Sequence, residues 1–194
     1  MAPYPTPAGT SQAEIREKGS RFLAVIGPAA GEAAAKAGLA EAVRRYSDAT
    51  HHCWAWRVGS PPRERSSDAG EPSGTAGVPI LQVLRGAGLS DVLAVVVRWF
   101  GGTKLGKGGL ARAYAAAARE ALPLLPVVVR VPTALLALRI PHEKVGAVKR
   151  LVHPPGVELE SEEYGEEARL VLAVHEQRVA GLRDALADLG IVVT

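Results

Sequence analysis

The sequence contains a single cysteine, Cys53, no asparagine and only three glutamines, and its 194 residues include just two Phe, three Trp and four Tyr. One cysteine excludes an internal disulfide and a metal site built from several cysteines. With so few aromatic rings, the core must consist mainly of Val, Leu and Ala. A scarcity of thermolabile amides is one trait of proteins from thermophiles, and a GC-rich codon bias produces the same composition.

Long hydrophobic runs are also missing. The apolar stretch Val92–Val97 is far shorter than the ~20 residues that span a bilayer. The N-terminal residues MAPYPTPAG have neither the basic start nor the apolar stretch of a signal peptide. We therefore expect a soluble protein of the cytoplasm with no membrane partner.

The charge is unevenly distributed. Residues 1–125 carry 15 Lys/Arg against 10 Asp/Glu, a net charge of +5, whereas residues 126–194 carry 8 against 10, a net charge of −2. This asymmetry favours two domains, with an anionic partner at the first. Ordinary surface charge is the alternative interpretation.

The first domain is expected over residues 10–125, after a Pro-rich flexible tail over residues 1–9. Hydrophobic periodicity and turn residues predict its elements. These are a hairpin of Thr10–Glu17 and Ser20–Ile26, a helix over Gly31–Tyr46, a strand over Thr50–Val58, a loop over Gly59–Gly74, a helix over Thr75–Leu84 capped by Thr75, a strand over Asp91–Phe100 and a helix over Leu110–Leu122.

Pro123 and Pro126 mark the boundary, because proline ends a helix. The second domain is expected over residues 129–194, and its predicted order β-α-β-β-α-β is the ferredoxin-like pattern. Its expected elements are a strand over Leu135–Ile140, a helix over Glu143–Val152, a hairpin of Val157–Tyr164 and Ala168–Val174, a helix over Glu176–Leu189 and a last strand over Ile191–Val193. The fold class is therefore α+β with two domains.

The motif with the most chemical content is VVVRWFGGTKLGKGGLARAY, residues 95–114. A buried strand enters a glycine-rich loop, where backbone N–H groups can face outward together, and a helix follows. Basic side chains gather on all three parts, so the motif predicts a surface for phosphates or nucleic acid. The predicted contact residues are Arg98, Gly101, Gly102, Lys104, Gly106, Lys107, Gly108, Gly109, Arg112 and Arg119.

Two other interpretations of this motif stay open. The stretch Gly101–Lys107 fits GxxxxGK, but the residue after the lysine is Gly108, so the hydroxyl that a nucleotide-binding P-loop uses for Mg²⁺ is missing. The glycines can also serve only to pack the strand closely against the helix.

A second glycine-rich segment, SDAGEPSGTAGVPIL, spans residues 67–81. Its polar side chains Asp68, Glu71, Ser73 and Thr75 form a possible functional loop. Two carboxylates can perform acid–base chemistry or hold a cation, and they can equally stabilise a turn and a helix N-terminus. No third ligand stands at a defined spacing, so neither a metal nor catalytic residues are predicted.

A third feature is His51-His52-Cys53-Trp54 on a predicted strand. Alternation places His51 and Cys53 on one face and His52 on the other. A nucleophilic thiol needs a base oriented toward it, and zinc needs further ligands. A small buried cysteine is the alternative.

Four segments, Glu14–Ala24, Ala49–Trp56, Gly70–Leu81 and Val95–Tyr114, resemble the YigZ/IMPACT family and occur in the family's order. The resemblance implies a fold like domain 2 of ribosomal protein S5, followed by a ferredoxin-like domain. This pair resembles domains IV and V of elongation factor G, which implies an RNA or ribosome partner. Eukaryotic relatives resemble the first domain only and regulate translation through a protein partner. Ala69 stands where the family usually has an acidic residue, which disfavours a metal in that loop.

Together these observations predict a non-enzymatic protein that binds RNA or the ribosome, or a translation-associated protein, and modulates translation without a cofactor. Two alternatives remain. One is a protein-interaction module that regulates a translation or stress factor, and the other is a metal-dependent nucleotide or phosphate-ester hydrolase that uses the glycine-rich loop together with Asp68 and Glu71.

Overall fold

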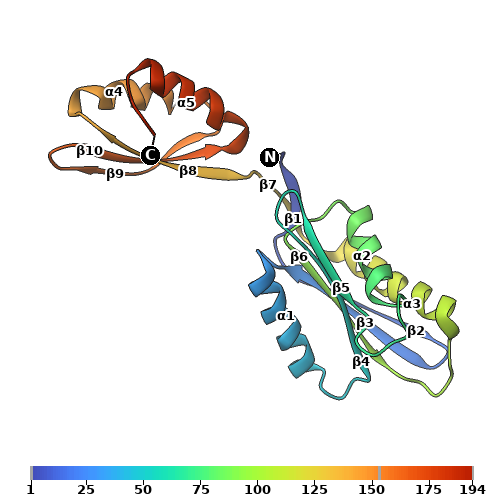
Figure 1. Cartoon of the computed structure of the whole chain (residues 1–194). Helices are drawn as coiled ribbons and strands as arrows, with labels where there is room; N and C mark the ends of the chain where they lie inside the picture. Colours follow the sequence, from blue (N-terminus) through green and yellow to red (C-terminus); the bar gives the residue numbers. More distant parts are fainter. Residues whose placement is uncertain (1, 153, 194) are drawn as a thin grey trace. The chain divides into compact units, whose positions relative to one another are not determined.

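The computed structural model describes residues 2–152 and 154–193, and their contacts divide the chain into two units. The larger unit spans Tyr4–Arg130, and the second begins at Val131. Both units combine strands with helices (Figure 1). The α+β, two-domain organisation expected from the sequence is therefore confirmed. Among the described residues, no helix is long and apolar enough to cross a membrane.

The larger unit is built on a five-stranded antiparallel sheet with the order β2-β3-β6-β4-β5. Strand β6 lies between β3 and β4, which explains why its valines are buried on both faces. The elements are β2 (Ser11–Glu17), β3 (Ser20–Pro28), α1 (Glu32–Arg45), β4 (His51–Val58), β5 (Arg63–Ser67), α2 (Gly77–Gly86), β6 (Val92–Trp99) and α3 (Gly106–Ala121).

Helices cover the two faces of this sheet unequally. Helices α2 and α3 pack on one face, where Phe22, Cys53 and Tyr114 belong to the main core cluster. Helix α1 covers β4 and β6 on the other face, around Trp56 and Val95. The strands β2 and β3 on the α1 side therefore keep an uncovered surface (Figure 1).

Strand β5 lies inside the segment that the sequence predicted as a loop, so that prediction was wrong. Its residues Arg63–Ser67 pair with β4 although they contain no large apolar side chain. Glu64 instead receives hydrogen bonds from Arg57 and Arg85. Because ion pairs rather than apolar side chains hold this edge strand, its sequence shows no alternation of apolar and polar residues.

The N-terminal residues also differ from the expected flexible tail, because Tyr4–Pro7 form strand β1, which pairs with β7 (Val127–Arg130). Proline is tolerated here because Pro5 faces away from β7, and its carbonyl oxygen accepts a hydrogen bond from the Ser90 N–H. The Tyr4 hydroxyl also donates to Asp91 at 2.7 Å.

The second unit holds a three-stranded antiparallel sheet with the order β8-β10-β9 and its own hydrophobic core. Its elements are β8 (Thr133–Ile140), α4 (His142–Leu151), β9 (Val157–Tyr164), β10 (Ala168–His175) and α5 (Val179–Asp188). The expected last strand over Ile191–Val193 is wrong, since these residues form no strand. Ile191 is buried instead against the core and donates its N–H to the Leu186 carbonyl at the end of α5.

Candidate nucleic-acid interface

The glycine-rich connection between β6 and α3 is shorter than the sequence suggested. Helix α3 begins at Gly106, not at Leu110, so Gly106, Lys107, Gly108 and Gly109 form its first turn. The true loop is Phe100–Leu105, in which Gly102 has a φ of 86° that glycine adopts without strain. Three glycines that the sequence placed in the loop, Gly106, Gly108 and Gly109, are thus helical, because α3 packs its next residue, Leu110, into the core.

Gly101 is required for close packing. A Cβ atom on Gly101 would lie 1.9 Å from the carbonyl carbon of Gly19 in the β2–β3 turn. The two backbones are therefore in direct contact, and the Gly101 N–H donates to the Ser20 hydroxyl at 3.2 Å. This contact holds the β2–β3 turn against the loop that begins α3.

Four of the predicted basic residues, Lys104, Lys107, Arg112 and Arg119, are exposed on the loop and on α3. Within the described part of the chain, none of the four has an ion pair or a side-chain hydrogen bond. Lys107 lies in the first turn of α3, where the partial positive charge of the helix N-terminus adds to the charge of the side chain. This segment is thus cationic without an internal counter-charge.

Arg98 does not belong to that exposed set, which corrects its predicted role as a phosphate contact. Only 4% of the residue is exposed, and its Nη1 atom lies 2.6 Å from Oε1 of Glu71. Its Nη2 atom donates to the Ser20 hydroxyl at 3.2 Å. The guanidinium is therefore bound inside the protein rather than offered to a ligand.

Glu71 is the centre of this buried cluster. Besides the ion pair with Arg98, its Oε1 atom accepts a hydrogen bond of 2.7 Å from the Tyr114 hydroxyl of α3. The His51 Nε2 atom lies 3.9 Å from the same oxygen. Only 4% of the Glu71 side chain is exposed. Its contacts with His51, Arg98 and Tyr114 connect the second glycine-rich segment to β4, β6 and α3.

Asp68 stabilises the start of α2. Its carboxylate accepts backbone N–H bonds of 2.8 Å from Gly74, Ala76 and Gly77. Burial alone would raise the pKa of Asp68, but these three N–H donors outweigh it and hold the pKa below the ordinary 3.8. The cap is thus supplied by Asp68 and not, as predicted, by Thr75.

The other two residues of the predicted functional loop have different roles. The Thr75 hydroxyl is buried and donates to the Pro72 carbonyl oxygen at 2.6 Å, inside the turn that precedes α2. Ser73 is exposed. The structure therefore brings Asp68 and Glu71 into the protein and leaves Ser73 at its surface.

Cys53 lies beside this cluster, fully buried. Its thiol donates to the Asp68 carbonyl oxygen at 2.9 Å, and burial, reinforced by the charges of Glu71 and Asp68, raises its pKa to about 12. At neutral pH the thiol is protonated, which removes its nucleophilicity. His51 donates from Nδ1 to the Ala69 carbonyl oxygen at 3.0 Å, so this histidine orients the loop.

His52 lies on the opposite face of β4, as the alternation predicted. Its Nε2 atom is 2.9 Å from the Tyr46 carbonyl oxygen, at the end of α1. Among the described residues, no group of three or more His, Cys, Asp and Glu side chains could hold a metal ion.

Ser20 and Tyr114 belong to the cluster, yet the sequence patterns indicated no role for either. Tyr114 is fully buried and its ring packs edge-on against Phe22, with centroids 5.1 Å apart. Burial raises the pKa of Tyr114 far above its ordinary value, so its hydroxyl stays a donor to Glu71. A tyrosine on the apolar face of a predicted helix signals a buried polar partner, because its hydroxyl must be satisfied. The sequence signal was therefore that Tyr114 lies four residues from both Leu110 and Ala118, on the same apolar face of the helix.

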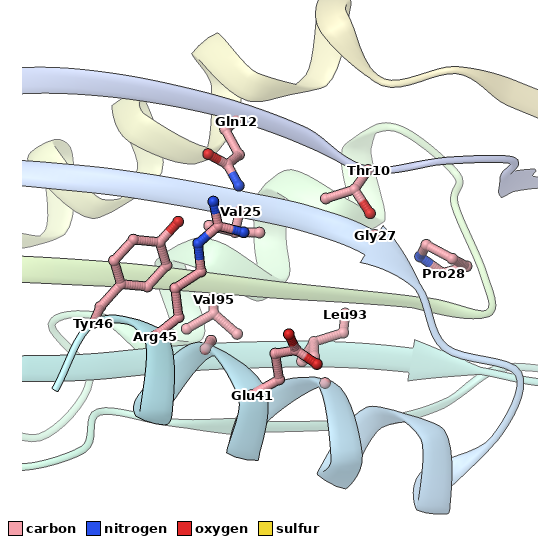
Figure 2. Close-up of a pocket in the computed structure, with 12 residues that line it drawn as sticks. Thr10, Gln12, Val25, Gly27, Pro28, Glu41, Arg45, Tyr46, Leu93 and Val95 are labelled. Atoms are coloured by element: carbon pink, nitrogen blue, oxygen red, sulfur yellow. The ribbon is translucent and has the colours of Figure 1, made fainter.

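A separate groove of about 310 Å³ lies on the α1 side of the sheet. Val25, Leu93 and Val95 line its floor, while Arg45 reaches from α1 toward Gln12 of β2 (Figure 2). The groove contains none of the residues predicted from the motifs. It exists because α1 contacts β4 and β6 and leaves β2 and β3 uncovered.

Comparison with known proteins agrees with this architecture. The model of the Impact N-terminal domain matches residues 18–122, more than half of the chain. The chain belongs to the IMPACT family. A domain of unknown function, DUF1949, matches residues 138–190 in the second unit.

Individual relatives match most of the chain. The IMPACT family member in the pol 5′ region of Thermus thermophilus is 44% identical over 153 residues, which cover 79% of this chain and 83% of that protein. The IMPACT family member YigZ of Escherichia coli K12 is 34% identical, with coverage of 88% and 85%. A solved structure described as that of a hypothetical protein is 32% identical, with a TM-score of 0.74 and coverage of 100% of this chain and 97% of that chain. The resemblance found in the motifs is thereby confirmed.

Proposed function

We propose that this protein binds RNA, free or within the ribosome, through the exposed basic surface of Lys104, Lys107, Arg112 and Arg119, and thereby modulates translation. The surface is hereafter called the α3 basic surface. The observation that carries the proposal is that these four side chains are exposed and have no acidic partner among the described residues. Cations that the fold does not pair are available to neutralise phosphates.

The framework around the surface supports this role. The contact between Gly19 and Gly101 fixes the loop at its first residue, and the cluster of Glu71, Arg98 and Tyr114 connects the end of β6 to α3. A rigid support lowers the entropy cost of ordering side chains on binding. The surface is thus held by a preformed scaffold.

The same contacts argue against the hydrolase alternative. Asp68 accepts three backbone N–H bonds, and Glu71 is buried against Arg98 and Tyr114. A general base must reach the proton that it removes, and these two carboxylates instead hold the fold together.

The test is equilibrium binding of the full chain to single-stranded RNA, structured RNA and purified ribosomes at about 50 and 200 mM salt. A contact surface of several phosphates loses orders of magnitude in affinity over this range. The variant Lys104→Ala/Lys107→Ala should bind all RNA sequences more weakly. Its salt slope should fall by roughly 0.7–0.9 for each lost contact.

A matched control is Lys36→Ala/Arg44→Ala on α1, which removes two exposed cations from the opposite face of the sheet. Unchanged binding in that control, with a reduced slope in the α3 variant, supports the proposal. Wild-type protein that fails to bind RNA or ribosomes at 50 mM salt contradicts it. Capture of one stoichiometric partner protein, insensitive to ribonuclease, then favours the interaction module.

A further inference from the structure

Phe100 is the aromatic side chain at the entrance of the glycine loop, directly after β6. It is one of only two phenylalanines in the chain, and 48% of it is exposed, whereas Phe22 is fully buried. The exposed area is not a consequence of a mobile backbone, because the Phe100 N–H donates to the Thr50 hydroxyl at 3.1 Å. The backbone that carries the ring is thus anchored to the residue before β4.

One face of the ring is already occupied. The guanidinium carbon of Arg98 lies over it, 5.4 Å from the ring centroid, and the ion pair with Glu71 holds Arg98 in place. Among the described residues, no other ring or cation contacts Phe100. With 48% of the residue exposed, the ring keeps a solvent-accessible surface that a planar group from outside can reach.

Basic residues occur in the two segments next to Phe100. Lys104 follows four residues later in the same loop, and Lys18 directly precedes Gly19, whose backbone contacts Gly101. Both lysines are exposed. Single-stranded nucleic acids bind where exposed aromatic rings and cations occur together, since bases stack on the rings while phosphates contact the charges.

We infer that Phe100 is a stacking platform for an unpaired base, so that the RNA bound by the α3 basic surface includes a single-stranded segment. This inference rests on the proposed function and makes it more specific. In a duplex every base is stacked within the helix and cannot reach the ring. The inference therefore predicts that Phe100 contributes to the binding of single-stranded RNA and not to the binding of double-stranded RNA.

The experiment compares a twelve-nucleotide oligouridylate with a twelve-base-pair blunt RNA duplex as ligands of the full chain. Phe100→Ala should weaken oligouridylate binding roughly 5- to 150-fold, the effect of losing one stacked base. Its binding to the duplex and its salt slope should be unchanged, because no charge is lost. Phe100→Trp should retain oligouridylate affinity, whereas Phe100→Leu, apolar but without a π-face, should resemble the alanine variant.

Leu124→Ala is the matched control, since Leu124 is 62% exposed beyond the opposite end of α3. Wild-type oligouridylate affinity in Phe100→Ala, together with weak binding in Lys104→Ala/Lys107→Ala, overturns the stacking inference and leaves the proposed function intact. Equal losses for oligouridylate and duplex also overturn it. If the wild-type chain binds neither of these RNAs and also fails to bind structured RNA and purified ribosomes, the proposed function itself fails. A protein partner that Phe100→Ala no longer captures would then assign this ring to protein recognition.

Discussion

Two glycine-rich segments precede the two helices on one face of the same sheet, and the fold uses their charges in opposite ways. In residues 67–77, Asp68 caps α2 and Glu71 is buried in an ion pair. In residues 101–109, Lys104 and Lys107 are exposed and have no partner among the described residues. Both segments are rich in glycine and each carries two charged side chains, yet one pair is used inside the fold and the other stays exposed.

The difference follows from where each segment lies. Residues 67–77 connect edge strand β5 to α2 and fold over Cys53 and Tyr114 in the core. Residues 101–109 leave central strand β6 at its end, where Gly101 packs against the Gly19 turn while Lys104 and Lys107 stay exposed. A charge near a core must be paired to offset its desolvation, whereas a charge at the end of a sheet stays hydrated.

The strongest test of this contrast removes Glu71. Because Arg98 is 4% exposed, Glu71→Ala leaves a buried guanidinium without its counter-charge. We expect a loss of about 3–5 kcal/mol in unfolding free energy, measured by urea denaturation. Glu120→Ala, which removes an exposed glutamate from α3, should stay within about 0.5 kcal/mol. A loss below about 1 kcal/mol in Glu71→Ala would contradict the structural role of the cluster.

Gly101 and Gly102 sharpen the contrast inside the cationic loop. In Gly101→Ala the new Cβ meets the Gly19 carbonyl carbon, so the turn and the loop must separate, at a cost of about 3 kcal/mol. Gly102→Ala meets no atom and adds only the strain of a positive φ, about 1 kcal/mol. Thermal unfolding of both variants measures the order, and equal losses would show that the close contact is not what fixes the loop.

Removal of the Asp68 carboxylate has a smaller effect that depends on pH. Asp68→Ala deprives three backbone N–H groups of their acceptor and should cost about 1–2 kcal/mol at pH 7. Since the folded-state pKa of Asp68 lies below 3.8, its ionised form stabilises the wild-type protein fully above that pH. The contribution is lost as pH falls through the folded-state pKa. Unfolding free energies of both proteins between pH 2 and pH 7 should therefore converge at low pH, and a constant difference would show that the charge is unimportant.

The α3 basic surface should contribute the least to stability. Lys104→Ala/Lys107→Ala removes two exposed, unpaired cations, so the unfolding free energy should change by no more than about 0.5 kcal/mol. RNA affinity should nevertheless fall in the same variant. Urea denaturation tests the expected stability, and salt-dependent binding tests the expected loss of affinity. A large loss of stability would show that these lysines stabilise the fold.

Most elements of both units could be predicted from local sequence patterns. The apolar run in β6, the Lys18-Gly19 turn and the amphipathic character of α1 each depend on residues close in the chain. Two of the missed strands lack such a signal, since β5 is polar on both faces and β1 carries two prolines. Strand β7 was missed although it contains three valines, because among the described residues it pairs only with β1. The predicted strand over Ile191–Val193 does not form, since these residues pack without pairing.

In the candidate site, too, the features that depend on neighbouring residues could be predicted, and those that depend on distant residues could not. The exposure of Lys104, Lys107, Arg112 and Arg119 agrees with the prediction from their motif, while their contact with RNA stays a proposal. Arg98 carried the same charge in the same motif, and its burial could not be predicted because its partners Glu71 and Ser20 are 27 and 78 residues away. Phe100 and Phe22 are the same residue type, and only their positions in the fold make the first exposed and the second buried.

The sequence alone therefore determined the two-domain α+β organisation, the family and the basic segment, because each is written in neighbouring residues or in local motifs. Only the tertiary structure decided which charged side chains are buried in ion pairs and which stay exposed. Burial and pairing depend on contacts between β3, β4, β6, α3 and the loop before α2, and the energy of a charge is set by the groups around it rather than by its neighbours in the chain.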